Sequence, residues 1–273
     1  MKDPFSQHPC WRGPSPETVE RIHLPVARSC NVKCSYCNGL GTRASHSRMP
    51  GYSAGTMSVD EAVRVFRDVR AARPKLRIAA VSGPGDPLAS MDSLALFQQI
   101  RMLDPEIDLC LCTNGLGLGD SAAALYRLGV STLSVSMSAL SEETAARVYE
   151  WAVLGGLCMS GPEMGRRVIQ MQLQGIEEAV RRGIHVKVNS IVLPGVNEHE
   201  LPDLASVLKD HGVELHNIVP LVPGGTMSHC RPPTSEQVES VRRMASRYIR
   251  QFRQCAQCRS DVVGVPGCDT SLL

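Results

Sequence analysis

Three cysteines near the N-terminus have a spacing suited to holding metal. They are Cys30, Cys34 and Cys37, and Tyr36 directly precedes the last one. Three thiolates on one tight loop can converge on one face of a [4Fe–4S] cube and hold three of its irons. The fourth iron then has no protein ligand, which leaves a coordination position open for a bound molecule. The alternative is a structural zinc site, which needs a fourth ligand, usually in paired C-x2-C or Cys/His form.

The composition is that of an ordinary globular protein, apart from its cysteine content. Lys plus Arg is 29 and Asp plus Glu is 27, so the formal charge of +2 gives no overall bias toward nucleic acid or anionic membranes. Eleven of the 273 residues are Cys, which is a smaller fraction than the roughly 8–10% typical of small disulfide scaffolds. There is no signal-peptide pattern, and no apolar run approaches the ~18 residues of a membrane span. We therefore expect a protein of the reducing cytoplasm whose clustered thiols bind metal or do chemistry.

Strand-like and helix-like stretches alternate along the chain, which predicts parallel strands joined by right-handed crossovers. The predicted strands cover 21–27, 76–82, 107–113, 132–137, 185–193 and 217–222, and the predicted helices cover 58–72, 91–103, 121–128, 163–182, 201–210 and 235–253. Six such units favour an α/β fold of the partial (β/α)6 TIM-barrel type over 21–234, between an N-terminal segment (1–20) and a C-terminal helix and tail (235–273). Chemistry in such folds collects at the carboxyl ends of the strands. A doubly wound sheet would instead want G-x-G-x-x-G after the first strand, where this chain has cysteines.

The cysteine loop after the first strand resembles the CxxxCxxC motif of the radical S-adenosylmethionine (SAM) superfamily. The resemblance implies that SAM chelates the open iron and is cleaved by one electron to a 5′-deoxyadenosyl radical. It also implies a glycine-rich SAM loop after the second strand, and this chain has Gly83, Pro84, Gly85 and Asp86 there. Glycines allow a close backbone approach to a ligand, and Asp86 could pair with an ammonium group; an ordinary tight turn is the alternative.

Three polar residues stand near the ends of later strands. Asn114, Ser136 and Asn189 follow or end the third, fourth and fifth predicted strands. Because ligands bind at these strand ends, we expect them to hydrogen-bond SAM or its ribose. Each could equally be a turn residue at a strand end.

Further runs resemble the NifB family of radical SAM proteins nearly from end to end. They are HPC (8–10), HLPVA (23–27), GPGDPLA (83–89), TNGL (113–116), VYEW (148–151), VKVNSIVLPGVN (186–197), NIVPLVPGGT (217–226) and CAQCRSDVVG (255–264). The resemblance implies nitrogenase cofactor biosynthesis, in which two [4Fe–4S] clusters fuse around a SAM-derived carbide into an [8Fe–9S–C] precursor. It implies iron–sulfur donors, carrier or scaffold proteins and an electron donor such as a ferredoxin as partners. No run resembles the NifX-like domain of some family members, so we expect the stand-alone form.

The same resemblance implies two auxiliary [4Fe–4S] clusters. Cys10, Cys255 and Cys258 match the ligands of one, although the C-x2-C pair alone would also fit a zinc knuckle or a tail with two free thiols. His23 and Cys110 match ligands of the other. A single histidine in a strand is otherwise more often a hydrogen-bonded core residue.

The chain departs from the NifB pattern a few residues after the cysteine loop. Arg43 stands where the family has another Cys, and SHSRMPG (45–51) replaces a stretch that usually contains a Glu. Cys112 follows Cys110 by two positions, and residues i and i+2 share one face of a strand. We therefore expect Cys112, or as second choice His46, to complete this site; a labile cluster is the alternative. Cys158, Cys230 and Cys268 match no ligand position and read as loop or packing cysteines.

Two other functions stay open at this point. One is a different radical SAM enzyme with auxiliary clusters that modifies a peptide or small molecule, which the absence of the family's Cys and Glu favours. The other is a non-enzymatic iron–sulfur scaffold or electron carrier, which would not cleave SAM.

Overall fold

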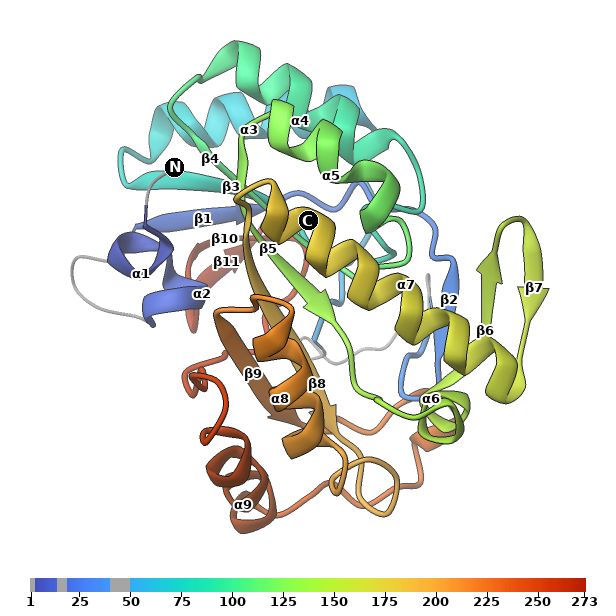
Figure 1. Cartoon of the computed structure of the whole chain (residues 1–273). Coiled ribbons are helices and arrows are strands. Elements are labelled where there is room, and N and C mark those ends of the chain that lie inside the picture. The colour runs from blue at the N-terminus through green and yellow to red at the C-terminus, as the bar shows by residue number, and fades with distance from the viewer. Residues whose placement is uncertain (1–2, 14–18, 40–49) are drawn as a thin grey trace.

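The computed structural model describes residues 3–13, 19–39 and 50–273, and an eight-stranded sheet lies at its centre (Figure 1). The strand order is β11-β10-β1-β3-β4-β5-β8-β9. Six of these strands run parallel in chain order: β1 (Glu20–His23), β3 (Leu76–Val81), β4 (Asp108–Thr113), β5 (Val130–Ser136), β8 (His185–Val192) and β9 (Leu215–Pro220). The mostly parallel α/β fold is thus confirmed, and the sheet is open, with β11 and β9 at its edges.

Helices cover one face of the parallel strands (Figure 1). They are α3 (Val59–Ala72), α4 (Asp92–Leu103), α5 (Leu118–Arg127), α7 (Gly161–Arg181) and α8 (Leu201–Asp210), with α9 (Ser235–Ala245) beside α8 and β9. Ser58 and Glu61 form a capping box at the start of α3, with reciprocal bonds of 3.2 and 2.7 Å. Among the described helices, none has the length and apolar character needed to cross a membrane.

Two predicted elements are shorter than expected, for identifiable reasons. The first strand was predicted to reach residue 27, but β1 ends at His23, and only Leu24 extends its hydrogen bonding before Pro25, which has no N–H to donate. The last helix was predicted to reach residue 253, but α9 ends at Ala245. The backbone after α9 bonds to His216 of β9 instead, through Arg250 O and Phe252 N.

Short antiparallel elements were missed. A three-stranded sheet consists of β2 (Val32–Cys34), β6 (Tyr149–Leu154) and β7 (Leu157–Met159), and α6 (Glu142–Val148) leads into it. A C-terminal hairpin, β10 (Val262–Val265) and β11 (Cys268–Ser271), extends the main sheet antiparallel to β1. The N-terminus forms two short turns of helix, α1 (Pro4–Gln7) and α2 (Pro9–Arg12).

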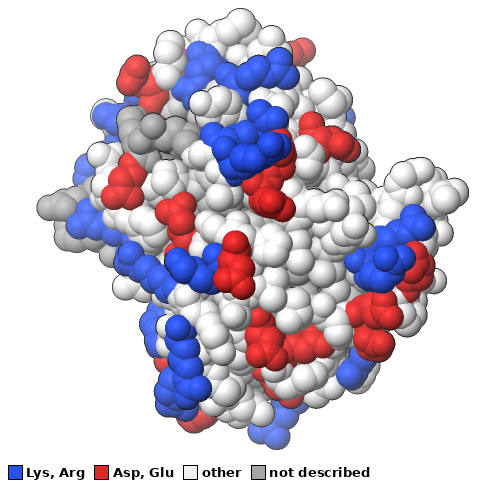
Figure 2. Space-filling view, in the orientation of Figure 1, with Lys and Arg blue, Asp and Glu red and all other residues white. Residues whose placement is uncertain are grey.

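The two faces of the main sheet differ in chemistry. Side chains that alternate toward the helices are apolar and buried; they include Ile22, Val81, Leu111, Leu133 and Val188. The opposite face carries His23, Cys110, Cys112, Thr132, Ser134 and Lys187. This second face is covered by α2 and by the segment around residues 249–259, so it is an interior face despite its polarity. On the outer surface in Figure 2, basic and acidic side chains are interspersed, in keeping with the small net charge.

Candidate functional site

The cysteine loop lies between the end of β1 and the small antiparallel sheet. Cys34 is the last residue of β2 and pairs with Tyr149 of β6. Ser35 binds the carbonyl of Val148 through both its backbone N–H (2.9 Å) and its hydroxyl (2.7 Å). A turn then closes with Cys37 N on Cys34 O at 3.0 Å. These bonds fix the backbone that carries the three cysteines.

The thiols of this loop are close enough to influence one another. Burial raises the pKa of the Cys34 thiol, and the neighbouring Cys37 and Cys30 raise it further. All eleven cysteines of the chain are free thiols. Among residues 3–13, 19–39 and 50–273, no three His, Cys, Asp or Glu side chains lie close enough to enclose one metal ion. The loop from Cys30 to Cys37 supplies three thiols and no fourth Cys or His, which suits a cluster with one open iron better than a structural zinc site with four protein ligands. The donor set fits the cluster.

The glycine-rich turn after β3 packs directly against the start of the cysteine loop. Gly85 N bonds to Ala27 O and Asp86 N to Ser29 O, both at 2.8 Å. A Cβ at Gly85 would lie 2.1 Å from Ser29 O, so only glycine allows this approach. Gly83 has φ +152 and Pro84 follows it in a cis peptide. The turn thereby positions the backbone that leads into Cys30.

Asp86 connects this turn to the end of β4. Its carboxylate is 4% exposed and accepts bonds from Thr113 Oγ1 (2.9 Å), Asn114 N (2.5 Å) and Leu88 N (2.9 Å). Burial raises the pKa of Asp86, against the lowering effect of these bonds. The ammonium partner expected for Asp86 stays a prediction; in this structure its oxygens support the loop after β4.

Asn114 reaches from the end of β4 to the cysteine loop. Its Nδ2 donates to Asn31 Oδ1 at 2.7 Å and lies 3.8 Å from Cys30 Sγ. The other two polar candidates lie beside Cys112: Asn189 Nδ2 is 3.6 Å, and Ser136 Oγ 3.9 Å, from its sulfur. Their expected contact with SAM is untested.

His23 and Cys110 lie in one row of the interior face. The register aligns His23 with Ala80, Ala80 with Cys110 and Cys110 with Thr132. Two strand spacings of about 4.8 Å thus separate His23 from Cys110, with only the small Ala80 between them. His23 Nδ1 lies 2.9 Å from the carbonyl of Arg259, so it must donate its proton there, which leaves the Nε2 lone pair available as a metal ligand.

Cys10, Cys255 and Cys258 come together on the same side of the sheet. Cys10 and Cys255 both pack against the cluster that contains Trp11 and Phe252. Burial raises the pKa of Cys258 to about 11, with Arg21 opposing and Cys10 adding to the rise. Arg21 Nη2 donates to Cys258 Sγ at 3.0 Å and to Asp269 Oδ2 at 2.6 Å. Two segments remote in sequence therefore meet around these thiols.

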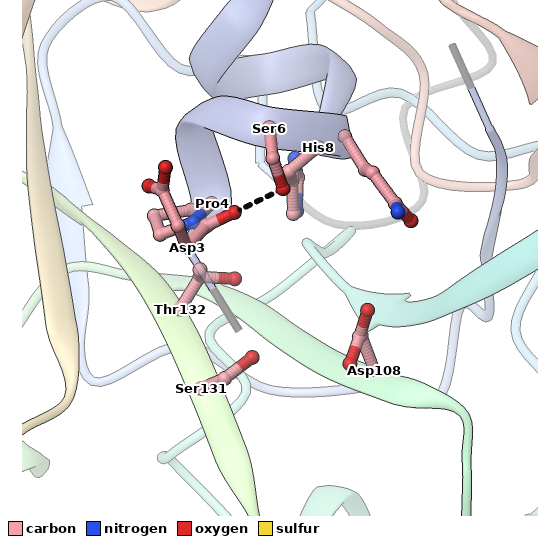
Figure 3. A pocket seen from close by; sticks show the side chains of 8 residues that line it. Asp3, Pro4, Ser6, His8, Asp108, Ser131 and Thr132 are labelled. Atoms are coloured by element: carbon pink, nitrogen blue, oxygen red, sulfur yellow. Dashed lines mark hydrogen bonds between the residues drawn. The ribbon is translucent and has the colours of Figure 1, made fainter. Parts of the chain in front are cut away.

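A hollow at the other end of the strands is a poor candidate for the site (Figure 3). Its walls include Asp108 at the start of β4 and Ser131 and Thr132 near the start of β5, far along the strands from the cysteine loop. Its volume of about 20 Å³ holds little more than a water molecule.

Comparison with known proteins decides the family. The radical SAM superfamily profile matches residues 24–208. The FeMo cofactor biosynthesis protein NifB of Methanocaldococcus jannaschii is 34% identical over 262 residues, which cover 94% of this chain and 86% of that protein. The chain belongs to the NifB family of the radical SAM superfamily.

Other relatives differ in length. The NifB of Klebsiella pneumoniae is 35% identical over 278 residues, which cover 99% of this chain and 59% of that protein, so the chain spans about three fifths of its length. Among solved structures, methylornithine synthase (PylB) superposes with a TM-score of 0.54 at 12% identity over 85% of this chain and 63% of that one. This likeness shows the fold alone.

The NifB-family site includes residues that the sequence did not single out. Gly225 lies where a Cβ would be 2.5 Å from Ser35 O, so the loop after β9 packs against the cysteine loop. Gln172 of α7 donates to Asn114 O (2.8 Å) and Ser136 O (3.0 Å). The pair of glycines in VPGGT was the visible signal for the first; a buried amide on an amphipathic helix gave no signal for the second.

The remaining residues singled out in the sequence are placed elsewhere or are not described. Arg43 and His46 lie outside the described residues. Cys158 and Cys268 are exposed on β7 and β11, and Cys230 is half-buried after the 3-10 turn Gly225–Met227.

Proposed function

We propose that this NifB-family chain is a radical SAM enzyme of nitrogenase cofactor biosynthesis. Cys30, Cys34 and Cys37 would hold a [4Fe–4S] cluster, with SAM on its open iron beside Asn114 and the Gly83–Asp86 turn. When bound, this cluster supplies the electron that cleaves SAM to a 5′-deoxyadenosyl radical. The chain contributes position: Tyr36, whose hydroxyl bonds to Cys34, and the loop after β9, which packs against Ser35, hold the cysteine loop in place.

One observation carries the proposal: β4 runs from the cysteine loop, which Asn114 contacts, to a second set of proposed metal ligands. Asn114, Cys112 and Cys110 are alternate residues, so they share one face and follow each other at about 6.7 Å per pair. Asn114 touches the cysteine loop, while Cys110 lies in the row of His23. A substrate held on the interior face would thus lie along the same strand as the SAM position proposed beside Asn114.

The interior face would hold the substrate clusters. We assign one [4Fe–4S] cluster to Cys10, Cys255 and Cys258 and the other to His23, Cys110 and Cys112. A first SAM would donate its methyl group to a cluster sulfide, and the radical from a second SAM would abstract hydrogen from that methyl. Fusion of the clusters around the carbon, with one further sulfide from an external sulfur donor and loss of the two remaining hydrogens as protons, would give the [8Fe–9S–C] product. The relatives are named for FeMo cofactor biosynthesis, which supports iron–sulfur clusters as the substrates. The convergence of both ligand sets on one face supports the fusion of these clusters.

Cys112 is the proposed third ligand where the family's usual Cys is replaced by Arg43. Cys112→Ala should therefore reduce the iron bound after anaerobic reconstitution by about four atoms per chain, one cluster. Cys268→Ala, which removes an exposed thiol outside the site, should bind as much iron as the wild type. Equal iron in Cys112→Ala and the wild type would remove Cys112 from the ligand set.

SAM labelled with ¹⁴C on its methyl group can show which class of molecule receives the methyl carbon. After turnover with the reduced, iron-loaded protein, the label should leave the protein together with extracted iron–sulfur cofactor. Label in a peptide or small organic product would instead support another radical SAM activity. Absence of any transferred label would support a scaffold.

Partners and cell compartment follow from this chemistry as part of the proposal. SAM cleavage needs one electron from a donor such as a ferredoxin, and the product needs a carrier or scaffold protein. Eleven free thiols fit a reducing cytoplasm.

A further inference from the structure

Lys187 is a buried cation without an anionic partner. It lies in β8, and its side chain is inside the protein, with the residue 4% exposed. Its Nζ donates to the carbonyl of Cys10 at 3.0 Å and lies 5.3 Å from the centre of the Phe252 ring. The described part of the chain offers it no ion pair with a carboxylate. An ammonium has three N–H donors, and burying it with so few partners costs free energy unless an anion arrives.

The sheet register places this ammonium beside the proposed cluster ligands. Cys112 aligns with Ser134, and Ser134 aligns with Lys187, so the three side chains form one row on the interior face. Two residues earlier along the same strands, Cys110, Thr132 and His185 form the neighbouring row on this face.

Other hydrogen-bond donors around this face are also unused. His8 Nδ1 accepts from Cys10 N at 3.1 Å, so the proton of the neutral ring lies on Nε2, which is buried and has no partner. Arg21 Nε is buried without a partner as well. Buried donors are normally satisfied. These two donors adjoin Cys10 and Cys258, so they favour an acceptor-rich, anionic group on the same interior face.

We propose that Lys187 is a positioning residue of the Cys110 and Cys112 site, where its ammonium compensates the negative charge of a thiolate-bound iron–sulfur cluster. This inference rests on the proposed function, because it needs a cluster at that site. Two thiolates and one neutral imidazole contribute two negative charges, so a bound cluster would be neutral with an oxidised [4Fe–4S]2+ core and would carry one net negative charge with a reduced [4Fe–4S]+ core, and its sulfides add acceptors. A buried cation one strand beyond Ser134 offsets that charge where water does not reach.

A purely structural role makes the opposite prediction for the iron-free protein. If Lys187 only ties the Cys10 carbonyl to the sheet, Lys187→Met should unfold at lower urea concentration than the wild type. If its charge is kept for the cluster, removing an unpaired buried ammonium should leave the iron-free protein at least as stable. Urea unfolding of the iron-free chains therefore separates the two roles.

The test compares four variants after anaerobic reconstitution. Lys187→Met should bind about four fewer iron atoms per chain than the wild type, and Lys187→Arg should retain most of that iron because it keeps the charge. Lys209→Met, which removes an exposed lysine of α8, should match the wild type. Formation of 5′-deoxyadenosine should persist in Lys187→Met, because Cys30, Cys34 and Cys37 are unchanged.

Cys110→Ser separates failure of this inference from failure of the proposed function. If Cys110→Ser loses iron but Lys187→Met does not, or if iron-free Lys187→Met is less stable than the wild type, the role of Lys187 is overturned and the cluster site stands. If Cys110→Ser binds as much iron as the wild type, the site holds no cluster, and both the role of Lys187 and the proposed function are overturned.

Discussion

Cys34→Ala should abolish formation of 5′-deoxyadenosine from SAM. Cys34 ends β2, and its half-buried thiol is hydrogen-bonded by Tyr36. Removing one of three thiolates leaves an iron without its ligand. We expect a loss of more than about 100-fold, since even groups that merely orient metal ligands cost about 10–100-fold when mutated. The measurement is 5′-deoxyadenosine released per chain from dithionite-reduced protein with SAM.

Cys158→Ala is the matched control for this prediction. Cys158 lies on β7, the other outer strand of the same small sheet, and its thiol is exposed. It should cleave SAM at the wild-type rate. Activity of Cys34→Ala within a few-fold of this control would exclude the cysteine loop as the site of SAM cleavage.

Gly85→Ala should impair both folding and SAM cleavage. The added methyl would lie 2.1 Å from Ser29 O and 2.9 Å from Ala27 O, and both are backbone atoms of the segment that leads into Cys30. That segment must move, so the thiols lose their common geometry. Overpacking of this kind costs about 1–3 kcal/mol of stability. Urea unfolding and bound iron per chain should both fall.

Gly119→Ala provides the opposite case. Gly119 lies within α5, and a Cβ there would have no atom within 4 Å. Alanine should stabilise the protein by about 0.5–1 kcal/mol, because glycine is unfavourable inside a helix. If Gly85→Ala matched Gly119→Ala in stability to urea and in iron bound per chain, the close backbone approach at Gly85 would not be needed for the site.

The chain order of the parallel strands could be predicted because each carries a long apolar pattern. The cysteine loop was equally visible, since its residues are contiguous in sequence. Both signals are local, and local patterns are what a sequence displays directly.

The C-terminal hairpin could not be predicted in this way. VVGV and CDTS are four-residue strands with little apolar periodicity, and their place is fixed by pairing with β1 and by the bond between Arg21 and Asp269, 248 residues apart. Lys187 posed a related difficulty. It alternates with Val186 and Val188, and this local pattern does not show that the N- and C-terminal segments cover its face of the sheet. In both cases, contacts between residues remote in sequence determine where the segment or side chain lies.

The most direct test of the account is to quantify two products from one reaction of the reduced, iron-loaded protein with SAM. Methyl transfer yields S-adenosylhomocysteine, and radical cleavage yields 5′-deoxyadenosine. We predict that both form, and that Cys34→Ala loses the 5′-deoxyadenosine. Formation of 5′-deoxyadenosine alone would contradict the proposed cluster fusion, and formation of neither product would contradict the assignment of an enzyme.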